Sequence, residues 1–439
     1  MSEIPPTSSI KLLLIAYYWP PSGGMGVQRW LRMSSHLVRS GVEVHVLTLD
    51  PESAHYPISD SSLLKEVDPR VHVTRVHAFN PFRIAKKLLG KRVPQTGFSS
   101  EGKSNFWLKG ITSLRSHLFI PDPRKTWNRK ALAAAKAIID EHGIQFVVTT
   151  GPPQSVHLIG HALKKSRSIH WIADFRDPWT DVFYYAKLQH SALSRFFDKR
   201  MERLVLCGAD AVVTVTPGFM RLLSEKVPLE QRKKFSVITN GYEGEEMMAP
   251  RHEPKTAFKI LYTGTLIESY QPEAFFESIN RIISEFPAIE VRIIGAVSNS
   301  YQQKLIERFP FVQFDGVLAH EVVIKRQKTA NALLLVGPEG AQHNGIVPGK
   351  LYEYLCTGVP IVYIGREDSD VGAILTSCSA GRTFQRKGHE DEMDEFNRSL
   401  VTNDQSLLRH EPNWTQIQKF RRDHVALEFL QLIHSMQKA

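Results

Sequence analysis

Lys350 and Glu353 stand one helical turn apart, directly after a loop that contains Gly345, Pro348 and Gly349. Proline suits the first position of a helix, where its missing N–H would have had no partner, so we expect a helix to begin at Pro348. A helix N-terminus offers free backbone N–H groups to an anion, and a lysine beside it adds positive charge. Because residues three apart share one side of a helix, the Glu353 carboxylate can accept hydrogen bonds from hydroxyl groups of the same ligand. These residues predict a site for a ligand with phosphate and hydroxyl groups; a capped helix packed on a sheet, with Glu353 solvated, is the alternative.

A second loop with glycines at positions 23, 24 and 26 follows the apolar run 10–17 and precedes a helix expected over 27–40. Glycines allow a ligand to approach the backbone at a helix N-terminus. Arg29 stands where a dinucleotide-binding fingerprint would have its third glycine, so the pattern argues against such a cofactor. We expect Gly23, Gly24 and Gly26 to lie near a phosphate or an acceptor group; a purely structural turn is the alternative.

A third polar group follows the strand expected over 169–175. Asp174, Arg176, Asp177 and Asp181 lie close together in sequence, with Trp179 among them. A carboxylate–guanidinium pair beside an aromatic ring can hold a sugar or a polar head group. The alternative is a surface loop in which Asp177 caps a turn.

Buried strands alternate with helices along almost the whole chain, which indicates parallel sheets with right-handed crossovers. At 439 residues the chain is too long for one core. We expect an α/β fold of two doubly wound, Rossmann-like domains facing a cleft: residues 1–242, a linker at 243–256, residues 257–410, and a final helical segment, 411–439. In open parallel sheets ligands bind at the carboxyl ends of the strands, where all three polar groups are expected.

The segment 345–364 resembles the donor-binding segment of the retaining glycosyltransferases of family 4, which have the GT-B fold. Glu353, followed by Gly358 and Pro360, matches the second glutamate of the family motif, which bonds the ribose of a sugar nucleotide. Gly345 occupies the place of the first glutamate, so half of the motif is present. The run Pro-Gly-Lys-Leu-Tyr-Glu-Tyr resembles a sub-branch that makes bacterial surface polysaccharides.

The resemblance implies where the donor diphosphate binds. Many family members have an arginine and a lysine after the strand-end glycine; here Gly264 is followed by Thr265 and Glu268 instead. We therefore expect Lys350 to bind the diphosphate, assisted by the backbone N–H groups of Gly264 and Thr265. Arg176 and Asp177 are the candidate catalytic residues on the other domain.

The resemblance also implies a reaction. The donor would be a UDP- or GDP-sugar, the acceptor a hydroxyl of a lipid-linked or growing surface glycan, and the leaving phosphate would accept the proton. No metal or cofactor is expected. The final helix would cross back to the first domain. A nucleotide-sugar 2-epimerase of the same fold and a non-catalytic membrane-surface scaffold are the alternatives.

The segment 81–130 carries twelve Lys and Arg residues against two acidic residues, and large apolar residues stand between them. An anionic membrane surface attracts such a segment. A solvated insertion and a nucleic-acid contact are the alternatives, and no nucleic-acid-binding motif supports the second. No stretch has the length of a membrane span, and the three cysteines share no metal-ligand spacing. We expect a cytoplasmic protein, peripheral on the inner face of the membrane if this segment binds lipid.

Overall fold

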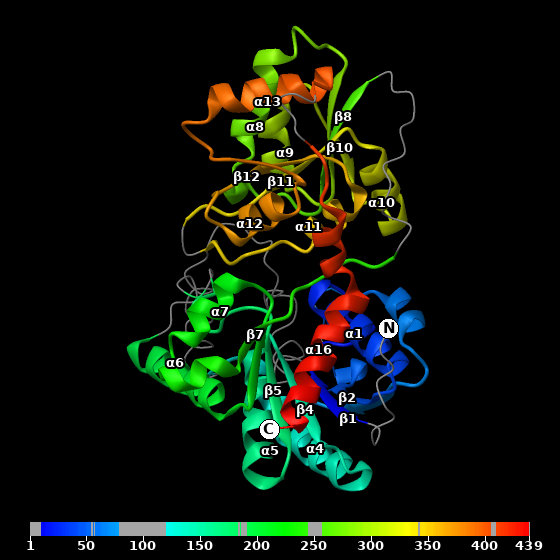
Figure 1. Cartoon of the computed structure of the whole chain (residues 1–439), viewed down its shortest axis with the longest axis vertical. Coiled ribbons are helices and arrows are strands. Elements are labelled where there is room, and N and C mark those ends of the chain that lie inside the picture. The colour runs from blue at the N-terminus through cyan, green and yellow to red at the C-terminus, as the bar shows by residue number, and fades with distance from the viewer. Residues whose placement is uncertain are drawn as a thin grey trace, which may run out of the picture. The chain divides into compact units, whose positions relative to one another are not determined.

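The computed structural model describes residues 10–53, 56, 58–78, 120–182, 185, 191–244, 257–340, 343–404 and 410–438. Most of the predicted linker and of the basic segment 81–130 lies outside these residues. The chain forms two compact units (Figure 1), each described here by itself. The N-terminal unit comprises Met1–Thr239 and Val425–Ala439, and the C-terminal unit comprises Asn240–His424. Within the described residues, none of the helices is both long and apolar enough to cross a bilayer.

The N-terminal unit is built on a seven-stranded sheet in the order β3-β2-β1-β4-β5-β6-β7, and all neighbouring strands are parallel. Its strands are β1 (Lys11–Ala16), β2 (Glu43–Leu49), β3 (His72–Val76), β4 (Phe146–Gly151), β5 (His170–Phe175), β6 (Ala211–Thr214) and β7 (Phe235–Val237). Its helices are α1 (Met25–Arg39), α4 (Asn128–His142), α5 (His157–Ser166), α6 (Ala192–Gly208) and α7 (Pro217–Ser224). Short 3-10 helices are η1 (Pro51–Ser53), η2 (Ser61–Glu66), η4 (Pro123–Trp127), η5 (Gln154–Val156) and η7 (Leu229–Lys234).

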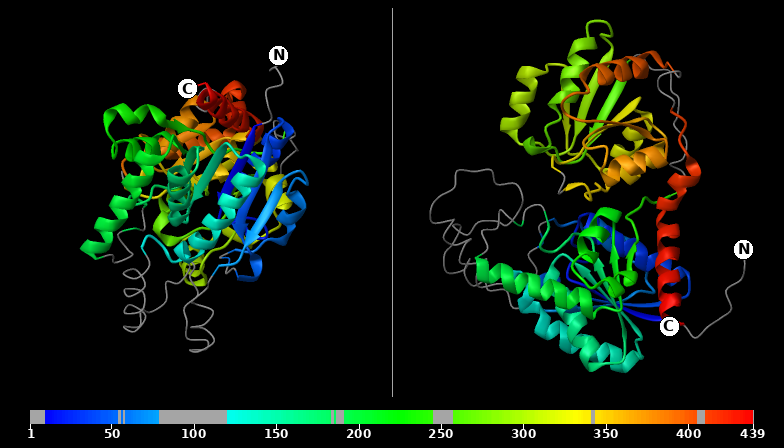
Figure 2. Two further views of the ribbon diagram at one scale, coloured as in Figure 1. Left: turned by 90° about the horizontal axis from the view of Figure 1, so that it is seen from below. Right: turned by 60° about the vertical axis from the view of Figure 1, so that its left-hand side comes forward.

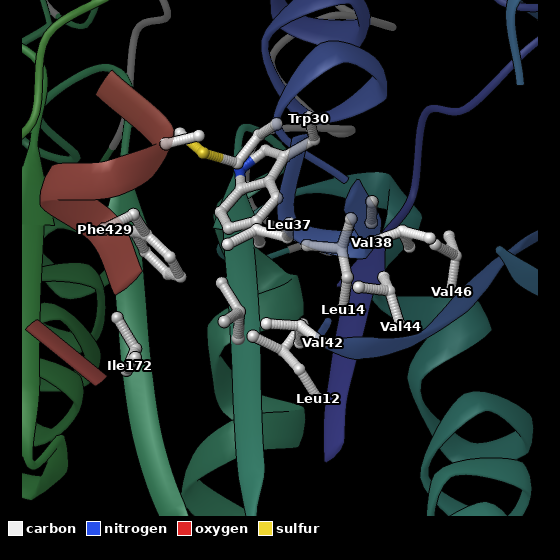
Figure 3. Close-up of a cluster of buried hydrophobic side chains, with 14 of the residues drawn as sticks. Leu12, Leu14, Trp30, Leu37, Val38, Val42, Val44, Val46, Ile172 and Phe429 are labelled. Atoms are coloured by element: carbon white, nitrogen blue, oxygen red, sulfur yellow. The ribbon is translucent and has the colours of Figure 1, made fainter. Parts of the chain in front are cut away.

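Apolar side chains cover both faces of this sheet, as expected for buried parallel strands. Alternate residues of β1 point to opposite faces, so Leu12 and Leu14 join one core and Leu13 joins the other. The first core also contains Trp30 of α1 and Phe429 of the last helix, whose rings meet edge to face with centroids 5.2 Å apart (Figure 3). The end of the chain is thereby part of the N-terminal unit.

The C-terminal unit contains a six-stranded parallel sheet in the order β10-β9-β8-β11-β12-β13, with helices on both faces (Figure 2). Its strands are β8 (Phe258–Thr263), β9 (Ile289–Ile294), β10 (Val312–Gly316), β11 (Ala332–Val336), β12 (Ile361–Ile364) and β13 (Gly381–Phe384). Its helices are η8 (Glu268–Tyr270), α8 (Glu273–Ile282), α9 (Asn299–Arg308), α10 (His320–Thr329), α11 (Lys350–Thr357), α12 (Asp370–Ser377), α13 (Glu390–Thr402), α15 (Trp414–Ile417) and η10 (Gln418–Phe420). The predicted fold class, two parallel-sheet α/β domains, is confirmed.

The final helical segment, predicted over 411–439, is not one continuous helix. The helix is broken at Arg421, which has an extended backbone (ψ 137°), and α16 then runs over Arg422–Gln437. The cause is Tyr242: its N–H donates to Phe420 O, and its carbonyl accepts from Arg422 N–H, each at 3.0 Å. These bonds pair Arg421 with Tyr242 as a short parallel bridge and take the backbone groups that a continuous helix would need.

The same contacts explain why the units divide at different residues than we predicted. The predicted boundary after residue 242 falls at Thr239, because the Tyr242 side chain is buried in a core of the C-terminal unit. Ile417 lies in that core as well, and Phe420 packs against it. The segment 411–424 therefore belongs to the C-terminal unit, and only residues from Val425 onward belong to the N-terminal unit.

Candidate functional sites of the two units

The carboxyl end of β8 presents a backbone N–H group, that of Thr265, which has no hydrogen-bond partner among the described residues. Gly264, at φ 96°, donates its N–H to Ile294 O at 2.7 Å, and Leu266 donates to Ala296 O at 2.9 Å. Between them, the exposed Thr265 has an N–H that makes no hydrogen bond with any described residue. We expected the N–H groups of both Gly264 and Thr265 to be available to a phosphate. The expectation fails for Gly264, because its N–H continues the ladder with the neighbouring strand β9.

Buried polar side chains hold this strand end in place. The Tyr354 hydroxyl of α11 accepts a hydrogen bond from Thr263 N–H at 2.9 Å and lies 3.0 Å from Thr263 Oγ1. Gln327 of α10 donates to the same Oγ1 at 3.1 Å, and the Tyr262 hydroxyl donates to Thr265 O at 2.8 Å. All four side chains are buried, so each bond forms away from water, where an unpaired polar group is costly. The end of β8 is therefore fixed to α10 and α11.

Lys350, the first residue of α11, reaches the same strand end. Its Nζ donates to Thr263 O at 2.8 Å and lies 3.7 Å from the centroid of the Tyr262 ring. A methyl group placed on Gly264 would lie 3.5 Å from this Nζ. Burial lowers the pKa of the Lys350 ammonium to about 7, although the Glu353 carboxylate opposes the shift. The predicted residues Gly264, Thr265 and Lys350 are thus neighbours.

The start of α11 adds further donors. The helix begins at Lys350 with Gly349 as its N-cap, so the prediction that Pro348 opens the helix is wrong. The Pro348 carbonyl accepts the Leu351 N–H at 3.0 Å, which makes Pro348 part of the preceding turn. The N–H groups of Gly349 and Lys350 make no hydrogen bond with any described residue. Together with Lys350 Nζ, they can bind an anion. Gly345 is buried in the loop that leads to this turn.

Glu353 lies one turn further along α11 and has a partner that the sequence did not suggest. Its Oε1 is 3.1 Å from Nε2 of His320, the first residue of α10. The Glu353 side chain is 22% exposed and that of His320 is 67% exposed, so a ligand can reach both. His320 follows β10, the edge strand of the same sheet, and a polar residue after the carboxyl end of one of its strands was the signal that could have identified it. A carboxylate paired with an imidazole can bind hydroxyl groups.

In the N-terminal unit, Arg176 brings the glycine loop together with the loops that follow β4 and β5. Its Nε donates to Gly151 O at 2.9 Å, and its Nη2 donates to Pro152 O at 2.8 Å. A methyl group on Gly26 would overlap Nη1 of Arg176, so only glycine allows the guanidinium to lie there. Because β1, β4 and β5 are adjacent in the sheet, these three loops meet at one edge.

The remaining predicted residues of that edge lie near Arg176. Gly24, at φ 97°, is the N-cap of α1, whereas the Gly23 N–H is already used by Ile58 O at 3.0 Å. Burial raises the pKa of the Asp177 carboxyl, and the Arg176 guanidinium opposes that shift. The Asp177 carbonyl accepts from Gln154 Nε2 at 3.3 Å. Arg176, Asp177 and the start of α1 form the candidate site of this unit.

Asp174 does not belong to that site. Its carboxylate is fully buried and accepts hydrogen bonds from Arg29 at 3.1 Å, Trp30 at 2.7 Å and Thr150 at 2.8 Å. Burial alone would raise the pKa of Asp174, but the Arg29 guanidinium and the hydrogen bonds hold it below its usual value. Arg29 also donates to Ile238 O at 2.9 Å, so this network joins α1 to the end of β7.

Trp179 and Asp181 are also structural, which corrects the prediction of an aromatic platform for a sugar. Trp179 is only 3% exposed, and its indole N–H donates to Asp198 of α6 at 2.8 Å. Asp181 forms an ion pair with Lys226. His157 is buried at the start of α5, where its Nδ1 is 2.9 Å from Thr149 Oγ1.

Comparisons with known proteins bear on the fold and the family of this chain. A family model described as "Glycosyl transferase 4-like domain" matches residues 23–241. No curated protein matches the sequence significantly. Sucrose-phosphate synthase from Thermosynechococcus elongatus has 14% identity and a TM-score of 0.62, over 98% of this chain and 99% of that one. The Anabaena protein HepE, in complex with UDP and glucose, has 11% identity and a TM-score of 0.61, over 97% and 100%.

A third similar structure is the lipopolysaccharide outer core galactosyltransferase WaaB, with 13% identity and a TM-score of 0.59 over 97% of this chain and 100% of that one. At these identities the solved structures establish the fold, which extends over both units. The match to the family model adds the type of enzyme. The chain is a glycosyltransferase of the family-4 type with the GT-B fold.

Proposed function

We propose that this glycosyltransferase transfers a sugar from a UDP- or GDP-sugar, with retention of anomeric configuration, to a hydroxyl group of a lipid-linked or growing surface glycan. The observation that carries the proposal is the group of donors in the C-terminal unit. It combines the Lys350 ammonium with the N–H groups of Thr265, Gly349 and Lys350, which have no hydrogen-bond partner in the part of the chain that the structure describes. A carboxylate stands one turn further on. A diphosphate and a ribose need these two kinds of partner.

In the proposed reaction the protein stabilises the departing diphosphate. Negative charge on the leaving oxygen grows as the glycosidic bond breaks, and preorganised N–H groups and a cation lower the barrier most where charge develops. Lys350 and the start of α11 supply that stabilisation, while Glu353 and His320 orient the ribose. The leaving phosphate takes the proton of the acceptor hydroxyl, so neither a protein base nor a metal ion is required in this scheme. Arg176 and Asp177 serve the acceptor side.

Two of the similar proteins support the choice of substrates. HepE was solved with UDP and glucose, which favours a UDP-sugar as the first donor to test. WaaB is described as a galactosyltransferase of the lipopolysaccharide outer core, which favours a surface glycan as acceptor. The sugar itself stays open, and we expect a hexose or an N-acetylhexosamine.

The test is thermal unfolding of the full chain with UDP, GDP, ADP and dTDP in turn. A nucleotide at 100 times its Kd stabilises by about 2.7 kcal/mol, which raises Tm by several degrees. We expect one nucleotide to do so in the wild type and none in Lys350→Ala or Glu353→Ala. Lys325→Ala and Glu395→Ala, exposed residues of α10 and α13, are the matched controls and should keep the shift. Without any shift in the wild type, the donor site proposed here is wrong and a non-catalytic scaffold gains support.

A second assay separates transfer from epimerisation. The matching radiolabelled nucleotide sugar is incubated with the protein and with an extract of lipid-linked glycans. Transfer moves the label into the lipid-soluble fraction only when the extract is present. A 2-epimerase would instead convert the nucleotide sugar at a rate that the extract does not change, and that result would exclude the proposed transfer.

A further inference from the structure

Helix α6 of the N-terminal unit buries both of its acidic residues and exposes four of its large apolar ones, while Val205 and Leu206 near its end are buried. Asp198 and Glu202 are each 1% exposed. Leu193, Phe196 and Phe197 are 65%, 59% and 45% exposed. Large apolar side chains normally lie inside a protein and charged ones outside, so these five positions of the helix have the reverse pattern. Figures 1 and 2 show α6 (green) at the periphery of its unit.

The buried acids fix which side of α6 faces the protein. Asp198 accepts hydrogen bonds from Trp179 Nε1 and from the Tyr185 hydroxyl, each at 2.8 Å. Glu202 accepts from Lys226 Nζ and from Thr180 Oγ1, each at 2.7 Å. Rotating the helix to bury the aromatic rings would break these bonds and leave buried donors unpaired. The apolar side is therefore held outward by the fold.

The outward side of α6 combines apolar and basic residues. Leu193, Phe196, Phe197 and Leu204 recur at spacings of three, four and seven, which place them on one side of the helix. The rings of Phe196 and Phe197 meet edge to face, with centroids 5.6 Å apart. Four further exposed residues of the helix are basic: Arg195, Lys199, Arg200 and Arg203. Both acids of the helix are buried, so its exposed surface carries positive charge only.

We propose that α6 docks on the surface of an anionic lipid bilayer, with its four apolar side chains at the boundary between head groups and acyl chains. Moving aromatic and leucine side chains out of water into this boundary lowers the free energy, and the basic residues attract anionic head groups. A second copy of this chain fits less well, since a symmetric contact through α6 would bring the basic residues of both copies together. A single helix face also offers less area than the roughly 800 Å² per partner of a stable dimer.

This inference stands apart from the proposed donor site and from the predicted membrane contact of segment 81–130, which stays a prediction. It rests on described residues of one helix. It is compatible with a lipid-linked acceptor, because such an acceptor lies at the same surface. A failure of the nucleotide-binding tests would leave it standing.

The test is flotation of the full chain with vesicles of phosphatidylcholine alone and with added phosphatidylglycerol. Two double variants remove the apolar and the basic contributions separately: Phe196→Ser with Phe197→Ser, and Arg200→Gln with Arg203→Gln. Their matched controls change exposed residues of η7. Leu229→Ser, at a side chain that is 75% exposed, is the control for the apolar variant. Arg232→Gln with Lys233→Gln is the control for the basic variant.

We expect the wild type to bind only the anionic vesicles, more weakly as salt is added. Each α6 variant should lower the partition coefficient by about tenfold or more, because two head-group contacts or two buried rings are lost. The controls should bind as the wild type does. Unchanged Tm values would show that the variants are folded, as expected for exposed positions.

Three results would overturn the inference. The first is that the wild type fails to bind anionic vesicles, or that it binds neutral vesicles equally well. The second is that the α6 variants bind anionic vesicles as tightly as the wild type does, which would place the contact elsewhere in the chain. The third is that the wild type binds no vesicles but sediments as a dimer, and that both α6 variants sediment as monomers. The exposed side of α6 would then contact a second copy of the chain.

Discussion

Raising the pH should weaken nucleotide binding through Lys350. In the ligand-free protein burial lowers the pKa of its ammonium to about 7. Only the charged form attracts a diphosphate, so affinity is lost as the pH rises through that value. About half of the molecules carry the charge at pH 7 and about 1% at pH 9. Since apparent affinity scales with the competent fraction, the Kd should rise about 50-fold between these two pH values.

Calorimetry with the nucleoside diphosphate found by thermal unfolding measures this effect. Between pH 7 and 9 the terminal phosphate of the nucleotide stays ionised, because its pKa is near 6. Titrations at pH 8.5 in two buffers of different ionisation enthalpy should reveal the uptake of nearly one proton per nucleotide bound. Lys350→Arg keeps its charge throughout, so its Kd should change little over the same range. Lys325→Arg, an exposed change on α10, should behave as the wild type does.

A Kd that stays constant from pH 7 to 9 in the wild type, with no proton uptake, would refute this reasoning. It would mean that the Lys350 ammonium keeps its proton despite its burial against Tyr262. A pH dependence that persists in Lys350→Arg would assign the titration to another group.

Two further predictions concern stability. Burial lowers the pKa of His157 to about 3, so the native state binds fewer protons than the unfolded state at acidic pH. Below the unfolded pKa of about 6.5 the free energy of unfolding should fall by up to about 1.4 kcal/mol per pH unit, until the pH reaches the native pKa. Urea titrations at pH 7 and pH 5.5 should show a smaller loss in His157→Gln; an equal loss would contradict the prediction. Gly26→Ala should destabilise by about 1–3 kcal/mol, because its methyl group would overlap the Arg176 guanidinium. It should cost less in an Arg176→Ala background, and the same cost in both would show that Arg176 is not the obstacle.

The sequence predicted those features that depend on neighbouring residues. Strands appear as short apolar runs, and glycine loops mark their carboxyl ends, so the two parallel sheets and the edge with the polar groups followed from local patterns. Lys350 lies beside Gly264 and Thr265 because the start of α11 follows β11, next to β8 in the sheet. The order of strands in an open parallel sheet brings such loops together.

What the sequence could not predict depends on partners far along the chain. Trp179 looked like an exposed ring beside charged residues, yet Asp198 is its buried partner. The final helix is broken because Tyr242, about 180 residues earlier, pairs with the backbone around Arg421. Periodicity and composition describe one segment at a time. They do not tell which polar group will be satisfied by a distant one, and this decides whether a polar residue is buried or exposed.

The position of Lys350 illustrates how one side chain can serve both the fold and the proposed chemistry. Its ammonium lies against the Tyr262 ring and donates a hydrogen bond to the Thr263 carbonyl, and burial lowers its pKa to about 7, so it carries its proton only in part near neutral pH. A bound diphosphate would supply the missing negative charge, raise the pKa of Lys350 and keep the proton in place. The Lys350 charge that stabilises the leaving group would thus be complete with the nucleotide bound, whereas without it only a fraction of the lysine side chains would be protonated. Arginine at this position would stay charged in both states, so in this proposal lysine is what couples donor binding to pH.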